Sequence, residues 1–193
     1  MGLPKLKTKI SIKDYLEGEK ISQIRHEYID GEVYAMAGTS KRHNEIIANI
    51  NDGIRRHLRG GNCRSFFVDI KVQVQKLNRF YYPDLIVVCG EDNESEYYTK
   101  KPTLIIEVLS PSTSLTDRRE KMFAYQEIEN LQEYIMIEQD RIYAEIYRRR
   151  DDGLWSWIEF DETEEIEFAS IDFRMLMTDI YEGVELPEIP NYL

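Results

Sequence analysis

The sequence reads YPDLIVV at residues 82–88 and TLIIEVLSPS at residues 103–112, and DRREK follows at residues 117–121. Both apolar runs are typical of buried β-strands, and the second is typical of a central strand that is covered on both faces. Each run holds one acid, Asp84 or Glu107, and a carboxylate in such a setting is costly unless a cation pairs with it or it gives up its charge. The two acids on neighbouring strands therefore indicate a shared cation.

A crossover connection is predicted after the second run. Ser110–Ser114 predicts a turn, the residues around Met122–Gln126 predict an amphipathic helix, and Glu133–Glu138 predicts another strand. A strand, a helix and a strand in succession usually form a right-handed crossover between parallel strands. We therefore expect Thr103–Leu109 and Glu133–Glu138 to lie side by side and parallel.

The remaining sequence predicts antiparallel pairs and further helices. Asp30-Gly31 is typical of a two-residue hairpin turn, and the isoleucines that follow Thr39 and Ser40 recur at helical spacing up to Gly60. The other expected elements are a short helix after Ser11, an antiparallel pair at 66–75 and 81–89, edge strands at 141–149, 154–160 and 164–168, and a short helix within 173–181. The fold class is therefore α/β or α+β: a mixed sheet flanked by helices, with an N-terminal hairpin and C-terminal antiparallel strands.

Composition limits the possible classes of protein. A length of 193 residues with 42% hydrophobic residues suits one domain, over residues 1–193, and no run approaches the roughly 20 apolar residues of a membrane span. We therefore expect a cytoplasmic protein. Cys63 and Cys89 suggest neither a zinc cluster nor a disulfide framework, and Cys89 is expected to be a small core residue.

The charge is uneven along the chain. The net charge is −11, which argues against a general nucleic-acid binder, but residues 151–193 hold 13 acidic residues and a single arginine. A local basic surface on the first part of the chain is therefore still compatible with the sequence, although its lysines and arginines form no long run.

The central residues suit phosphodiester hydrolysis. That reaction needs a cation to neutralise developing negative charge and to make a water nucleophilic, and hard divalent ions prefer carboxylate and carbonyl oxygens. Asp84, Glu107 and the carbonyl of Val108 are such donors. A nearby lysine, Lys121 or Lys71, is a candidate to assist the attacking water or to balance charge.

These residues resemble the PD-(D/E)xK nuclease superfamily and, within it, the Uma-two family, whose members are described as putative restriction endonucleases. The similarity covers roughly Glu27 to Gln139. Its parts, in order, are the Asp30-Gly31 hairpin, His43, Asp69, Tyr82-Pro83-Asp84, Glu107 to Thr113, and Asp117 through Lys121 to Tyr125. The resemblance implies a restriction-endonuclease-like core, Asp84 and Glu107 as ligands of Mg²⁺ or Mn²⁺, and DNA as the substrate.

One position departs from the superfamily pattern. The lysine expected two places after Glu107 is absent, because Leu109 stands there. The resemblance favours Lys121 as its replacement, and Lys71 stays the alternative. Glu32 and His43 are candidates to complete the site, and Asp69, Lys71 and Gln73 are candidates to line it.

Each candidate also has an ordinary structural interpretation. Asp84 can accept hydrogen bonds from the backbone at the start of a strand, and Glu107 can pair with a buried arginine or lysine. His43 can be a polar residue at the margin of a helix face. Lys121 stands four places after Asp117, which is also typical of an exposed helical ion pair.

Three functions follow from these alternatives. The first is a metal-dependent DNA nuclease, which edge strands and the resemblance predict to be a homodimer. The second is a catalytically inactive nuclease-like fold that serves as a binding or structural protein, favoured by Leu109 and by the net charge. The third is a metal-dependent hydrolase of a small phosphorylated molecule, which would suit the acidic surface.

Overall fold

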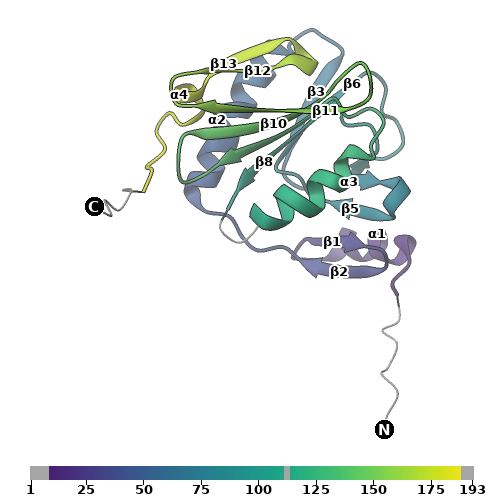
Figure 1. Ribbon diagram of the computed structural model, residues 1–193. Coiled ribbons are helices and arrows are strands. Elements are labelled where there is room, and N and C mark those ends of the chain that lie inside the picture. The colour runs from purple at the N-terminus through teal and green to yellow at the C-terminus, as the bar shows by residue number, and fades with distance from the viewer. Residues whose placement is uncertain (1–8, 111–113, 188–193) are drawn as a thin grey trace.

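A computed structural model describes residues 9–110 and 114–187 of the chain (Figure 1). Within these residues the strands form a six-stranded sheet of order β11-β10-β9-β8-β6-β3, a five-stranded sheet of order β2-β1-β5-β4-β7, and a β12-β13 pair. The helices are α1 (Ile12–Ile21), α2 (Lys41–His57), η1 (Gln75–Leu77), η2 (Thr116–Lys121), α3 (Met122–Gln126), η3 (Ala169–Ile171) and α4 (Met177–Ile180). The strands are β1 (His26–Ile29), β2 (Glu32–Ala35), β3 (Cys63–Phe67), β4 (Lys71–Val74), β5 (Arg79–Tyr81), β6 (Leu85–Cys89), β7 (Tyr98–Thr99), β8 (Leu104–Leu109), β9 (Glu133–Glu138), β10 (Tyr143–Arg149), β11 (Trp155–Asp161), β12 (Glu165–Phe168) and β13 (Phe173–Leu176).

The six-stranded sheet confirms the predicted crossover. β8 and β9 are parallel, with Leu104 opposite Glu133 and Leu109 opposite Glu138. The other neighbouring pairs of this sheet are antiparallel. The mixed sheet with flanking helices confirms the predicted α+β class. The Asp30-Gly31 hairpin is also confirmed, because both turn residues have positive φ, 45° and 94°.

The two faces of the six-stranded sheet carry separate cores. Side chains alternate between faces along a strand, so Leu104, Ile106 and Val108 of β8 point one way and Ile105, Glu107 and Leu109 the other. The first set packs against the buried isoleucines of α2, and the second face packs against α3. Figure 1 shows α2 and α3 on these opposite sides of the sheet. The alternation therefore directs Glu107 toward the side that carries the crossover helix.

The antiparallel pair predicted at 66–75 and 81–89 is wrong in detail. Each run divides between two sheets: β3 pairs with β6 in the six-stranded sheet, whereas β4 pairs with β5 in the five-stranded one. Val68 and Asp69 have positive φ, 60° and 67°, a conformation that ends an extended strand. Pro83 interrupts the returning run, because proline cannot donate a ladder hydrogen bond. This division is what places Asp84 at a junction between two sheets.

The C-terminal prediction also needs correction. β12 does not extend the large sheet; it pairs with β13, where a helix was expected to begin. Asp172 adopts φ of 51° between them, and Phe173–Leu176 then alternates half-buried and exposed side chains as a strand does. Helix α4 begins only at Met177. The predicted turn at Ser110–Ser114 lies partly outside the described residues.

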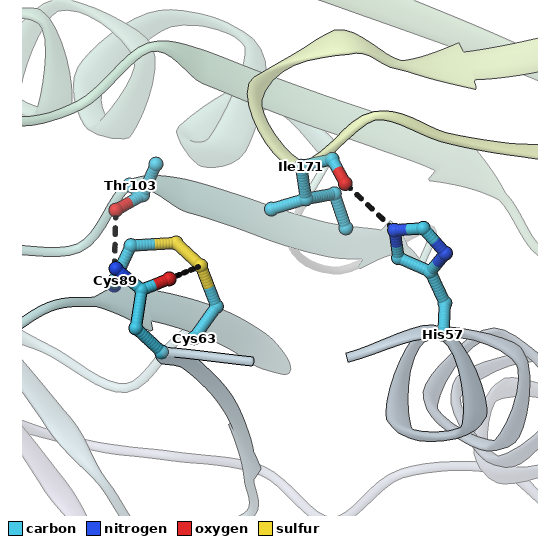
Figure 2. The surroundings of a disulfide bond; sticks show 6 residues. His57, Cys63, Cys89, Thr103 and Ile171 are labelled. Carbon is cyan, nitrogen blue, oxygen red and sulfur yellow. Dashed lines mark hydrogen bonds between the residues drawn. A yellow bond between two sulfur atoms is a disulfide. The ribbon is translucent and has the colours of Figure 1, made fainter. Parts of the chain in front are cut away.

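Cys63 and Cys89 form a disulfide bond, which contradicts the prediction that the two cysteines make no disulfide framework and that Cys89 is a small core residue. The two residues stand directly opposite each other on β3 and β6. Figure 2 shows the bond, with Thr103 Oγ1 accepting a hydrogen bond from the backbone N–H of Cys89 at 3.2 Å. In the same region His57 Nε2 lies 2.8 Å from the carbonyl of Ile171, which ties α2 to η3 (Figure 2). The disulfide thus links the edge strand β3 to the strand that follows Asp84.

We expect reduction of this disulfide to lower the free energy of unfolding by about 3 kcal/mol, because it releases a loop with a sequence separation of 26 residues. Urea unfolding with and without dithiothreitol measures the difference. A Cys63→Ala/Cys89→Ala double variant is the control and should not respond to the reductant. Equal stability of the wild type in both conditions would contradict the expectation. Disulfides are rare in cytosolic proteins, so a loss of stability on reduction would argue against the predicted cytoplasmic location.

In the part of the chain that the structure describes, no helix has the length and apolar character needed to cross a membrane.

Candidate active site

A pocket of about 430 Å³ lies where the six-stranded sheet meets the hairpin and the crossover helix. Its wall includes the predicted residues Asp84, Glu107 and Lys121. It also includes His43 from α2, Glu27 from β1 and Asp117 from η2. The site therefore draws on two sheets and two helices that are far apart in sequence.

Asp84 and Glu107 are adjacent and joined through the backbone. The N–H of Val108 donates to Asp84 Oδ2 at 2.8 Å, and the N–H of Asp84 lies 3.3 Å from Glu107 Oε2. His43 Nε2 lies 3.1 Å from the same Asp84 Oδ2. These contacts fix the orientation of both carboxylates, because each has an oxygen that accepts from a neighbour held in a strand or helix.

Lys121 is buried among three carboxylates. Its Nζ lies 3.1 Å from Glu107 Oε1, from Asp117 Oδ1 and from Glu27 Oε1. The hydroxyl of Tyr125 also donates to Glu107 Oε1 at 3.1 Å. The ordinary interpretation, an exposed ion pair with Asp117, is wrong in its exposure: the pair is present, but both residues are buried.

The electrostatics of the cluster follow from this imbalance of charges. Burial raises the pKa of Glu107 well above its usual value; Lys121 opposes the shift, and the carboxylates of Asp117, Asp84 and Glu27 add to it. Burial lowers the pKa of Lys121, but Glu107, Asp117 and Glu27 together outweigh it, so the net shift is upward. Lys121 therefore stays charged, and its single positive charge is shared by several acids.

Local structure explains how these side chains meet. Tyr28 points into a cluster with Tyr15 and Phe80, so its neighbour Glu27 projects to the opposite face of the hairpin sheet. Thr116–Lys121 forms a π-helical turn, a rare geometry that is common at functional sites. Asp117 and Lys121 both face inward from that turn.

The structure brings only some of the predicted supporting residues together. His43 and Val108 line the pocket. Glu32 is not part of the pocket wall; it accepts a hydrogen bond at 2.9 Å from the hydroxyl of Tyr34, which does line the pocket. Gln73 lines a separate hollow beside Lys76, and it does not contribute to this pocket.

Asp69 and Lys71 also lie apart from the carboxylate pair. Asp69 accepts two hydrogen bonds from Arg25, at 2.9 and 2.8 Å. Lys71 Nζ lies 3.3 Å from the hydroxyl of Tyr82, in a neighbouring cavity of about 540 Å³. Of the two lysines that the sequence left open, Lys121 is therefore the one beside Glu107.

The sequence predicts no role for Glu27 or Tyr125, and it identifies Asp117 as part of the family resemblance and as an ion-pair partner of Lys121 but not as a site residue. The signal for Glu27 was available, since it alternates with the apolar Tyr28 in a predicted strand. Tyr125 stands four places after Lys121, which is one helical turn and so predicts a shared face. Asp117 stands four places before Lys121, so the same spacing places it on that face.

The donor set suits a magnesium-type ion. Mg²⁺ is usually held by one or two carboxylates together with waters and substrate phosphates, which Asp84, Glu107 and the Val108 carbonyl match. Within residues 9–110 and 114–187, no group of three or more His, Cys, Asp or Glu side chains converges as metal ligands, so a closed zinc-type site is not built there. Glu27 Oε1 and Asp117 Oδ1 are buried and make no aligned hydrogen bond, although each lies at ion-pair distance from Lys121. This surplus of negative charge is what a divalent cation would offset.

Comparisons with known proteins identify the fold and the family of the chain. A structure described as a putative nuclease of the DUF820 group, from Anabaena variabilis, superposes with a TM-score of 0.73 over 91% of this chain and 99% of that chain, at 17% identity, and so shares the fold. Two uncharacterized Synechocystis proteins, slr1290 and sll1609, are 33% and 31% identical over 91% and 83% of this chain, and each match covers 93% of the relative. The model of the Uma2 family, described as "Putative restriction endonuclease", matches residues 12–175. The chain therefore belongs to the Uma2 family.

Proposed function

We propose that the protein is a divalent-metal-dependent nuclease that hydrolyses phosphodiester bonds, with DNA as its substrate. The observation that carries the proposal is the convergence of Asp84, Glu107 and Lys121 in one pocket, with Lys121 Nζ 3.1 Å from Glu107 Oε1. Membership of the Uma2 family supports the same reaction class.

Each residue of the pocket has its own role in the proposed reaction. A cation held by Asp84, Glu107 and the Val108 carbonyl would neutralise charge on the phosphate and make a bound water more acidic. Lys121 supplies a permanent positive charge beside Glu107, where negative charge develops in the transition state. His43 orients Asp84 through their hydrogen bond. Tyr125 and Lys121 hold Glu107 in place through Oε1.

The departure at Leu109 has a structural explanation in this proposal. Leu109 is buried in the core between the sheet and α3, where a charged amine would have no water. Lys121 reaches Glu107 from η2 instead. The positive charge that the superfamily pattern places on the strand is thus supplied by the crossover helix.

The second candidate function is a nuclease-like protein that binds without turnover. One observation favours it: the Lys121 ammonium has three carboxylate oxygens at 3.1 Å, and it donates a hydrogen bond to one of them, Glu107 Oε1. A lysine that is enclosed by carboxylates in this way already balances their charge, which is a structural role that needs no turnover. Binding and cleavage must therefore be measured separately.

Metal binding and cleavage together test both candidates. We expect Mn²⁺ at 100 times its dissociation constant to stabilise the protein by about 2.7 kcal/mol, which a thermal-shift titration detects. We expect the same metal to support cleavage of labelled DNA. Asp84→Asn should lose both effects. Stabilisation by Mn²⁺ without cleavage of DNA or RNA would establish the second candidate, and cleavage that survives in Asp84→Asn would reject the site.

The predicted homodimer and cytoplasmic location remain proposals. β2 and β11 end their sheets in the described part of the chain, and such edge strands can pair with a second copy. Sedimentation equilibrium measures the oligomeric state, and a monomer at micromolar concentration would reject the dimer.

A further inference from the structure

An apolar chamber of about 370 Å³ opens directly beside the carboxylate pocket. The two hollows share His43, Tyr82, Asp84 and the segment 36–39, so they form one continuous groove. The chamber has fewer acidic residues on its walls than the pocket: Asp69 and Asp84 line the chamber, whereas Glu27, Asp84, Glu107 and Asp117 line the pocket. The apolar lining residues include Ile24, Met36, Ile47, Phe67, Val68 and Pro83.

Large apolar side chains stand exposed around this chamber. Ile24 is 54% exposed, Phe67 42% and Val68 61%. Single exposed hydrophobic residues are common, but several around one hollow indicate a binding surface. Because the hollow adjoins Asp84, a molecule that reacts at the carboxylates would lie against this surface.

The wall of the chamber is held in a strained conformation. Val68 and Asp69 have positive φ in succession, 60° and 67°, and a β-branched residue rarely adopts that region. Two hydrogen bonds from Arg25 to Asp69 hold the turn. Such strain is retained where the surrounding structure enforces it, often at binding sites. The turn therefore places Phe67 and Val68 at the chamber in advance of any ligand.

Charge around the groove narrows the class of substrate. A protein that binds duplex nucleic acid usually relies on many lysine and arginine contacts to phosphates. Among the described residues that line the pocket and the chamber, the lysines and arginines are Lys121 and Arg25, and both are paired with carboxylates. The groove therefore lacks the row of cations that duplex binding relies on, and its exposed contact surface beside Asp84 consists of aromatic and aliphatic side chains.

We propose that the chamber takes an unpaired nucleobase next to the scissile phosphate, so that the substrate is single-stranded or locally unpaired nucleic acid. The inference rests on the proposed nuclease function. Phe67 is the stacking surface, and Ile24 and Val68 flank the base. Stacking on aromatic side chains tolerates any base, because every base has a π-face.

Binding is measured with fluorescent (dT)₁₀ and with the matching duplex, in Ca²⁺ or with Glu107→Gln to prevent cleavage. We expect tighter binding of the single strand, weakened about tenfold by Phe67→Ala and preserved by Phe67→Trp. Ile24→Ser is an independent variant with the same expected direction. Phe123→Ala is the matched control, because Phe123 is 64% exposed on α3 and does not line the chamber.

Equal binding of duplex and single strand, or single-strand binding unchanged in both Phe67→Ala and Ile24→Ser, would overturn the inference. A change of oligomeric state in Phe67→Ala without a change in binding would overturn it as well, because the surface would then contact a second copy of the chain. Cleavage assays in Mg²⁺ distinguish a failure of the proposed base-binding chamber from a failure of the proposed nuclease function. If duplex is cut as well as single strand, and Phe67→Ala cleaves normally, the role of the chamber is rejected and the nuclease function is retained. If binding depends on Phe67 but no nucleic acid is cleaved, the role of the chamber is retained and the nuclease function is rejected.

Discussion

Glu107→Gln is expected to reduce metal-dependent cleavage by about 100- to 1000-fold, the loss typical when one group that stabilises transition-state charge is removed. The substitution keeps the shape of the side chain but removes the negative charge that would hold the cation. The same change should not lower stability. Burial raises the pKa of Glu107, so ionising it opposes folding, and a neutral amide avoids that cost. Cleavage assays and urea unfolding of the same preparation measure the two effects.

Glu133→Gln is the matched control for this prediction. Glu133 is also a buried acid, but it accepts hydrogen bonds from Arg148 Nε at 2.7 Å and from the N–H of Ser170 at 2.8 Å, away from the pocket. We expect its substitution to cost about 1–3 kcal/mol of stability and to leave cleavage by the folded protein intact. The opposite pattern, with activity lost in Glu133→Gln and retained in Glu107→Gln, would show that the reactive site has been placed wrongly.

The centre of the fold is predictable because its signals are local. The apolar run of β8, the helix that follows and the run of β9 lie in succession, and their connection allows essentially one arrangement. Alternation along β8 then separates Glu107 from Ile106 and Val108 without further information. The position of Glu107 on a central strand follows from those two rules.

The remainder of the candidate site depends on contacts between segments that are far apart in sequence. Glu27 reaches Lys121 only because β1 pairs with β5, which places the hairpin beneath the crossover helix. Lys71 and Lys121 are both candidates in the sequence, with Lys121 favoured by the family resemblance alone, and the division of the run at Val68 separates them in the structure. Hydrophobic periodicity does not reveal where a strand run passes from one sheet to another at a positive-φ turn, because the segments before and after the turn are both apolar.

The disulfide was missed for a related reason. Two cysteines in a chain without a disulfide-rich pattern are usually core residues or free thiols. Cys63 and Cys89 meet because the register of β3 against β6 places them opposite each other. Register follows from the pairing of whole strands, and β3 begins at Cys63, three residues before the run predicted from residue 66.

Lys121→Met is expected to lower the free energy of unfolding by about 3–5 kcal/mol at pH 7, because it leaves buried carboxylates without their cation. Glu107 and Asp117 are both buried, and each lies 3.1 Å from Lys121 Nζ in the native protein. The loss should shrink as the pH falls, since burial raises the pKa of Glu107 and a protonated Glu107 no longer needs the cation. Urea unfolding at pH 7 and at lower pH measures the difference from the wild type.

Lys71→Met provides the comparison that decides why Lys121 matters. Lys71 is equally buried, but no carboxylate of the described residues forms an ion pair with it; its hydrogen-bond partner is Tyr82. Burial lowers the pKa of Lys71, so its charged form opposes folding and its replacement should be neutral or stabilising. Cleavage should persist in Lys71→Met and vanish in Lys121→Met. Similar losses of stability in both variants would mean that the buried carboxylates do not need the charge of Lys121. Activity lost only in Lys71→Met would show that Lys71, in the neighbouring cavity, is the reactive amine.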